Sequence, residues 1–193
     1  MQVIPEKIKK NKLFLLLFIL SWKIIFGQNI NKDSIIEWNQ NRKLTWSDFL
    51  DKPDDNIIAD ALTSYKIEVV PSNVIVDQYD RIQNYNELSV KANFYKYHSW
   101  YIENTKELLE HEQLHFDIAE LYARKMRMEF MKMKNKNESR FESYLNCYKR
   151  LWKECRKLQQ EYDFETNNGR IREENLKWIN KITIELSKFD NYK

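Results

Sequence analysis

Hydrophobic and polar residues alternate along the middle of the chain, with the period of two that is typical of β-strands having one buried face. In ALTSYKIEV, residues 61–69, one side carries Ala, Thr, Tyr, Ile and Val, and the other side carries Ser, Lys and Glu. LSVKANF, residues 88–94, alternates in the same way, and VIVDQY, residues 74–79, predicts a further strand. Short apolar and aromatic pieces at residues 34–40 and 44–50 predict a packed segment leading into the sheet.

Beyond residue 100 the apolar residues recur every three or four positions, which is the period of α-helices. A first helix is predicted to run to about Lys132. A second has an apolar stripe from Phe141 to Tyr162, and a third has apolar residues from Leu176 to Leu186 on its inner face. Asn104 or Thr105 is suited to cap the first helix, and an Asn-Asn-Gly sequence ends the second. Strands followed by helices predict an α+β fold, in which three helices pack on one face of a small antiparallel sheet.

The N-terminal residues have the layout of an export signal. A lysine-rich start precedes the apolar run LFLLLFILSW, so residues 1–27 are predicted to be a signal peptide that is removed near Gly27. The alternative is an uncleaved membrane anchor, but the run is about half of the ~20 residues of a spanning helix, and Lys23 follows it. We therefore expect an exported protein, periplasmic or secreted, whose residues 28–193 form a single domain, with membrane proximity only through an uncleaved signal.

Composition and charge indicate how many domains the chain forms and exclude one class of function, nucleic-acid binding. The chain has 193 residues, 42% of them hydrophobic and 14% aromatic, which is enough for one well-filled domain. Its formal net charge is +3, but five lysines and one glutamate in the first 27 residues contribute +4, which leaves about −1 for the rest. A mature domain with this charge is not expected to bind nucleic acid.

The sequence HEQLH, residues 111–115, contains two of the three histidines of the chain. Residues four apart lie on one face of a helix, so His111 and His115 can both direct a ring nitrogen at one metal ion. Glu112 lies beside them and can take a proton from a metal-bound water. This is the chemistry of HExxH zinc hydrolases, although the same five letters also occur by chance in charged helices.

A zinc hydrolase site needs a third protein ligand. The HxxGxxH continuation of the motif is absent, and Glu120 would point about 140° away from His115 on a straight helix. A downstream carboxylate is therefore required, and EYDFETNNG at the end of the second helix offers Asp163 and Glu165. We favour Asp163. His98 is the other candidate, but its position one turn before the first helix suits a capping or packing role better.

Further residues could act around the metal. Asp117 could orient a metal-bound imidazole, or it could form a surface salt bridge. Tyr162 could donate a hydrogen bond to the substrate, although its place on the apolar stripe of the second helix favours a core role. Glu165, if it does not bind the metal, would belong to the same surroundings.

Three segments together resemble the bacterial family called domain of unknown function 922, whose members are regarded as secreted or periplasmic zinc-dependent proteases. They are LTWSDFLDKPDDNIIADALTSYKI, SWYIENTKELLEHEQLHFDIAELYARKMR and EYDFETNNGRIREENLKW, and they cover nearly all of the mature chain. The resemblance implies that His111 and His115 bind zinc (Zn2+) and that Glu112 is the catalytic base. It extends to a second motif, which matches Tyr162, Asp163, Glu165, Thr166 and Gly169.

One position departs from the family pattern, because Asn168 stands where a histidine usually precedes the glycine. Our first hypothesis is a zinc-dependent metallopeptidase with a zincin-like fold, which cleaves peptide or protein substrates held by an exposed edge strand. The second, motivated by Asn168, is a catalytically weak or inactive exported domain that has a structural or partner-binding role.

Overall fold

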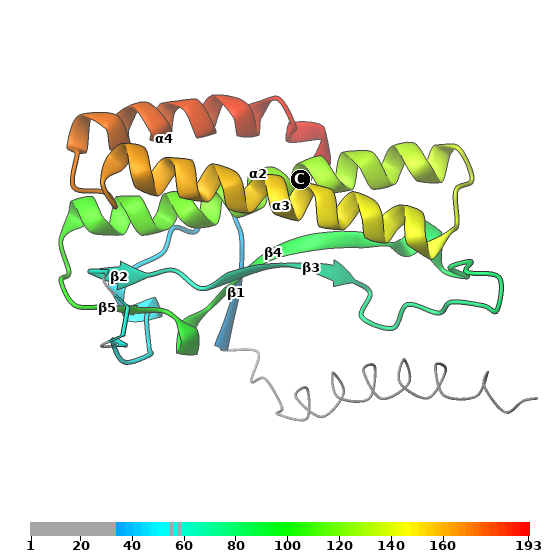
Figure 1. Ribbon diagram of the computed structural model, residues 1–193, viewed down its shortest axis with the longest axis horizontal. Coiled ribbons are helices and arrows are strands. Elements are labelled where there is room, and N and C mark those ends of the chain that lie inside the picture. Colours follow the sequence, from blue (N-terminus) through cyan, green and yellow to red (C-terminus); the bar gives the residue numbers. More distant parts are fainter. Residues whose placement is uncertain (1–33, 55, 58) are drawn as a thin grey trace, which may run out of the picture. The chain divides into compact units, whose positions relative to one another are not determined.

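The structure is a computed structural model that describes residues 34–193 except residues 55 and 58. The predicted signal peptide lies outside the described residues. Among the helices of the described part, none combines the length and the apolar character needed to cross a lipid bilayer. The prediction of an α+β fold with a small antiparallel sheet and three helices is confirmed (Figure 1).

The main sheet has three antiparallel strands in the order β1-β4-β3. They are β1 (Ile35–Glu37), β3 (Tyr65–Val70) and β4 (Ser89–Tyr95). A second pair is formed by β2 (Ala61–Leu62) and β5 (Trp100–Tyr101), also antiparallel. Because β2 directly precedes β3, and β5 closely follows β4, the two pairs continue one another along a single long ribbon.

Among the described residues, no strand pairs with the outer edge of this ribbon at β2. The carbonyl of Asp60 accepts a hydrogen bond from the Ile102 amide at 2.7 Å, and that of Ser64 accepts one from the Tyr95 amide at 2.9 Å. Backbone groups of successive residues in an antiparallel strand point alternately toward and away from the partner. The intervening residues Ala61 and Thr63 therefore direct their amide and carbonyl groups away from the paired strand.

Two predictions about strands need correction. The predicted strand at 61–69 is divided between two strand pairs, because residues 96–98 form a 3₁₀ turn that interrupts the facing strand. The predicted strand at 74–79 is wrong, since only an isolated bridge between Val76 and Ile82 forms there. The Asp77 carboxylate accepts hydrogen bonds from the amides of Tyr79 and Arg81, which closes a tight turn instead.

Three long helices cover one face of the sheet, as the sequence predicts (Figure 1). They are α2 (Lys106–Asn135), α3 (Phe141–Thr166) and α4 (Arg172–Ser187). The Thr105 hydroxyl caps α2 by accepting a hydrogen bond from the Leu108 amide at 3.2 Å. Short 3₁₀ helices occur at Trp46–Asp48, Tyr85–Glu87, Lys96–His98 and Asp190–Tyr192.

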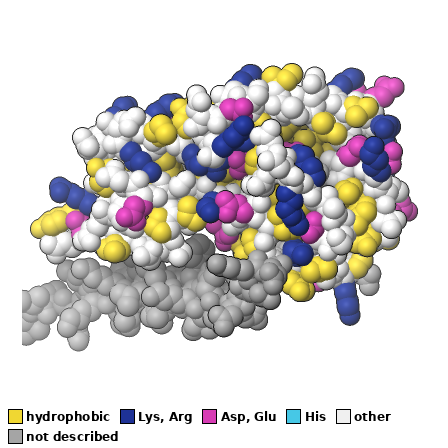
Figure 2. Space-filling model, turned by 180° about the vertical axis from the view of Figure 1, so that it is seen from behind, with side chains coloured by type: hydrophobic (Ala, Val, Ile, Leu, Met, Phe, Trp, Pro, Cys, Tyr) yellow, Lys and Arg dark blue, Asp and Glu magenta, His cyan; other side chains and the backbone are white. Residues whose placement is uncertain are grey.

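The hydrophobic core lies between the sheet and the helices. Strands β3 and β4 contribute Ile67, Val90 and Phe94, each almost fully buried. Their neighbours across the layer include Phe116 of α2, whose ring lies 5.9 Å from that of Phe94. Many charged side chains lie on the surface, where Figure 2 shows basic and acidic groups interspersed on the face turned away from the view of Figure 1.

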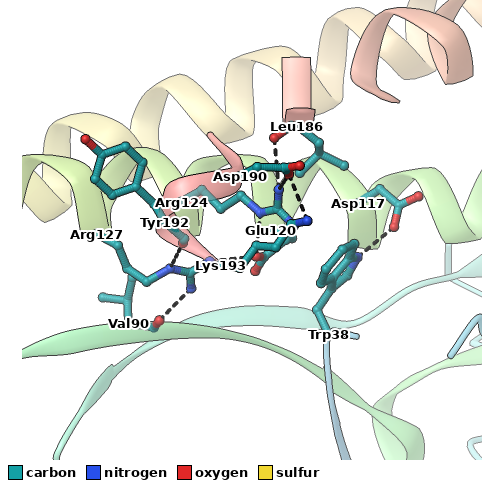
Figure 3. A network of polar contacts seen from close by, with 10 residues as sticks. All are labelled: Trp38, Val90, Asp117, Glu120, Arg124, Arg127, Leu186, Asp190, Tyr192 and Lys193. Atoms are coloured by element: carbon teal, nitrogen blue, oxygen red, sulfur yellow. Dashed lines mark hydrogen bonds and ion pairs between the residues drawn. The ribbon is translucent and has the colours of Figure 1, made fainter. Parts of the chain in front are cut away.

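Buried charges also occur in the middle of α2, where Glu120 lies between two arginines (Figure 3). Its carboxylate is 2.9 Å from Nε of Arg124 and 2.6 Å from Nη2 of Arg127. Arg124, which is 1% exposed, also donates to the Leu186 carbonyl and to Asp190. This network joins α2 to the segment that follows α4, and it gives Glu120 a structural role.

Replacing Glu120 with Gln should destabilise the protein by about 3 kcal/mol or more, because it leaves two guanidinium groups without a buried counter-charge. Urea unfolding of the purified protein measures the change. Glu154→Gln is the matched control, since Glu154 also pairs with an arginine four residues away at 2.9 Å, but on the surface. Its effect should stay below about 0.5 kcal/mol. Equal effects of the two substitutions would contradict the structural role of Glu120.

Candidate metal centre

The helical spacing of HEQLH brings two imidazoles together at the first third of α2. The Nε2 atoms of His111 and His115 are 3.1 Å apart. Asp163, near the end of α3, places its Oδ1 atom 3.3 Å from the first of these nitrogens and 3.0 Å from the second. The three side chains form a group that could hold a metal ion.

The spacing of these three atoms fits a small cation. Zinc bound at about 2.0–2.1 Å in a tetrahedron separates its ligand atoms by about 3.3 Å. The three distances between the donor atoms are 3.1, 3.3 and 3.0 Å, so one ion could contact all of them with little movement. Three protein donors leave a fourth position for water or substrate.

The protonation of the group follows from its burial and its charges. Burial disfavours the charged form of His115, but its hydrogen bond to Asp163 and the negative charges of Glu112 and Asp163 outweigh this and raise its pKa to about 9. Burial lowers the pKa of His111. Burial would raise the pKa of Asp163, but hydrogen bonds from both imidazoles hold it well below its usual range. A proton on His115 therefore lies where a cation would bind.

Gln159 fixes the orientation of His115 from behind. Its Oε1 atom is 2.5 Å from Nδ1 of His115, and its Nε2 atom donates to the His115 carbonyl at 2.9 Å. An amide oxygen in this place requires a hydrogen on Nδ1 and leaves Nε2 directed at the metal position. Gln159 was not among the residues predicted from the sequence, although it lies one helical turn before Asp163 and so on the same face of α3.

Asp117, for which the sequence left open either the orientation of an imidazole or a surface salt bridge, lies on another side of α2. Its carboxylate accepts hydrogen bonds from Nε1 of Trp38 at 2.7 Å and from Nε2 of Gln113 at 2.8 Å, and Lys43 is 3.2 Å away. Figure 3 shows Trp38 pointing at this carboxylate. Asp117 thereby ties the segment after β1 to α2, and the contact expected of it is made by Gln159.

Glu112 lies beside the histidines with only 3% of its surface exposed. Within the described part of the chain, its Oε2 atom is buried and has no hydrogen-bond partner. A buried carboxylate oxygen without a partner is costly, and such atoms are common where a small polar molecule binds. The Thr63 hydroxyl donates to the Glu112 carbonyl at 3.2 Å, which fixes β2 over this turn of α2.

Tyr162 is fully buried and packs against both histidines. Its ring is stacked on that of His111 at 4.6 Å and meets the His115 ring edge-on at 5.1 Å. Its hydroxyl is engaged by Asn175 and by the carbonyl of His111. This geometry matches the core role, and a hydroxyl held in this way is not directed at a substrate.

The other two candidate ligands lie outside the group of three. The Glu165 carboxylate accepts a hydrogen bond from Nε1 of Trp178 at 2.7 Å, which links α3 to α4. The His98 ring lies in the 3₁₀ turn before β5, 6.1 Å from the ring of Tyr95. Of the carboxylates weighed for the third ligand, the structure therefore brings Asp163 to the histidines.

The turn after α3 packs directly on the metal group. Asn167, Asn168 and Gly169 all have left-handed backbone conformations, with φ of +50°, +54° and +79°. A β-carbon at Gly169 would lie 2.7–3.0 Å from atoms of His111, so no larger residue fits here. The group of three is complete without residue 168, and Asn168 instead lines the mouth of the cleft.

A cleft of about 230 Å³ opens over the metal group. Its floor is formed by the histidines, Glu112 and Asp163, and its walls come from the β2 edge on one side and from α3 with the following turn on the other. The wall residues are Ala59, Asp60, Ala61, Leu62, Thr63, Tyr65, Leu108, Gln159 and Asn168. The free backbone groups of Ala61 therefore border the same space as the candidate ligands.

Comparison with known proteins finds a family model that matches the part of the chain containing these residues. No curated protein and no solved structure matches the chain. Residues 80–169 match the model of the family described as "Bacterial protein of unknown function (DUF922)". The matched part runs from before β4 to Gly169, and it contains α2, α3 and the whole group His111, His115 and Asp163. The resemblance found in the sequence is thereby confirmed over residues 80–169, and this part of the chain is similar to the DUF922 family.

Proposed function

We propose that this protein is an exported zinc-dependent metallopeptidase with a zincin-like active site. One observation carries the proposal: the buried Glu112, with an unpartnered carboxylate oxygen, borders the same cleft as the three candidate ligands. A structural metal site needs no free base beside it. A hydrolytic site does, because an attacking water must give up a proton.

The donor set favours zinc over the harder cations. Two imidazole nitrogens and one carboxylate oxygen form the ligand set of several zinc hydrolases, whereas magnesium and calcium prefer oxygen ligands. Asn168, which motivated the hypothesis of an inactive domain, removes no member of this set. The departure from the family pattern is therefore compatible with activity.

Different side chains of the site would have different roles in peptide hydrolysis. Zinc, when bound, would polarise the substrate carbonyl and acidify a water molecule. His111, His115 and Asp163 would hold it, and Gln159 would keep the His115 ring in place through its Nδ1 hydrogen. Glu112 would take the proton of the attacking water and pass it to the leaving amine, which completes the hydrolysis.

A peptide substrate is favoured by the free edge of β2. Ala61 and Thr63 direct their amide and carbonyl groups away from the paired strand, and both line the cleft. An extended peptide could add to this edge by main-chain hydrogen bonds, with its carbonyl groups passing over the metal group. Export, which rests on the pattern of residues 1–27, would bring the site to peptides outside the cytoplasm.

Glu112→Gln should retain zinc and lose peptidase activity by about 10²–10⁴-fold, because the amide cannot accept the proton. The assay compares cleavage of a denatured protein and zinc content by mass spectrometry. Glu110→Gln, two residues earlier on the same helix, is the control and should behave as the wild type. Bound zinc with no more cleavage in the wild type than in Glu112→Gln would contradict the peptidase proposal.

Asp163→Ala should weaken zinc binding at least about a hundredfold, since it removes the one oxygen donor of the group. Competition with a fluorescent chelator measures the affinity. Glu165→Gln should leave the affinity unchanged, because Glu165 bonds to Trp178 away from the histidines. Unchanged zinc binding in Asp163→Ala would show that another residue is the third ligand.

Zinc binding at pH 7 should release about one proton, because His115 has a pKa of about 9 in the metal-free protein and must be neutral to bind. The raised pKa means that protons compete with zinc below pH 9, so affinity should increase as the pH rises toward that value. Calorimetric titration in buffers of different ionisation enthalpy counts the protons. A heat of binding that is independent of the buffer at pH 7 would contradict this assignment.

A further inference from the structure

A second hollow lies beside the metal group, along the last turns of α3 and the turn that follows. It has a volume of about 540 Å³ and is lined by Gln160, Asp163, Phe164, Asn167, Asn168 and Ile171. Phe164 is 86% exposed and Ile171 is 45% exposed. Phe164 follows a candidate metal ligand in the sequence. An aromatic ring as exposed as this one contributes little to the stability of the fold.

This hollow adjoins the metal cleft, since Asp163 and Asn168 line both. Apart from Asp163, whose carboxylate faces the two histidines, the residues that line the hollow carry no formal charge. A charged substrate side chain would therefore find no counter-ion there. A large apolar side chain would cover Phe164 and Ile171 and would lose its own contact with water.

A peptide bound at the edge of β2 would direct some of its side chains toward the hollow around Phe164. A peptide added to the β2 edge continues the sheet, and its side chains point alternately to the two faces. The helices cover one of these faces, so every second side chain would point into the helix layer (Figure 1). Across the metal cleft from β2, that layer ends in the last turn of α3, which carries Phe164.

We propose that the hollow around Phe164 and Ile171 is a specificity subsite, and that the substrates are peptides with a large aromatic or aliphatic residue close to the cleaved bond. This inference rests on the proposed peptidase function and names the substrate class of the same site. Occupation of an apolar pocket of this kind discriminates by about ten- to a hundredfold between a large apolar and a small polar side chain.

The test compares two blocked hexapeptides, acetyl-Ala-Ala-Phe-Ala-Ala-Lys-amide and the same peptide with Ser in place of Phe. Binding to the zinc-loaded Glu112→Gln protein is measured by calorimetry, since this variant should not cleave them. The Phe peptide should bind at least about tenfold more tightly. In the wild type, the ratio of kcat/KM for the two peptides should show the same preference.

Phe164→Ser in the same background should reduce the preference to less than about twofold and leave the zinc content unchanged. Tyr79→Ser is the matched control, because Tyr79 is 69% exposed in the turn before Ile82 and does not line either hollow. It should keep the full preference. Both substitutions remove exposed rings, so neither is expected to affect folding.

The possible failures can be told apart. Equal binding of the two peptides, or a preference for the Phe peptide that survives Phe164→Ser, would overturn the proposed subsite. If the wild type nevertheless cleaves denatured protein, the peptidase proposal still stands. A preference lost in Phe164→Ser, in a protein that never cleaves, supports the subsite and overturns the peptidase proposal. Absence of both binding and cleavage overturns the two together.

Discussion

The contact between the Asp163 carboxylate and the two imidazoles of α2 is the interaction on which the site depends. It joins residues about fifty positions apart, and it exists because α3 returns along α2 after a short turn. Two buried imidazoles and a partly exposed carboxylate so close together are unfavourable unless a proton or a cation lies between them. The raised pKa of His115 shows how the metal-free protein meets this requirement.

The helical half of the fold could be read from the sequence because a period of three or four over many residues is a strong local signal. The end of α3 agrees with the prediction, including the left-handed conformation at Asn167. The strands were less predictable. Alternation in 74–79 was overridden by a turn at Asp77, and the break at residue 63 depends on how the distant residues 96–98 fold.

The residues of the candidate site also differ in how well the sequence predicts their positions. His111, Glu112 and His115 belong to one helical turn, so their spacing alone places them together. Gln159 gave no such signal, because an amide side chain acquires its role only when α3 packs behind the histidine. Asp117 is the opposite case, since its position in sequence suggested a contact that Trp38 and Gln113 occupy instead.

Gly169 has a consequence of a different kind. Its missing β-carbon leaves the space that the His111 ring fills, and its left-handed conformation is one that other residues adopt only with strain. The geometry of the candidate metal centre thus depends on the absence of a side chain at residue 169. Glycine has no reactive group, yet any methyl group placed there would push the His111 ring out of alignment.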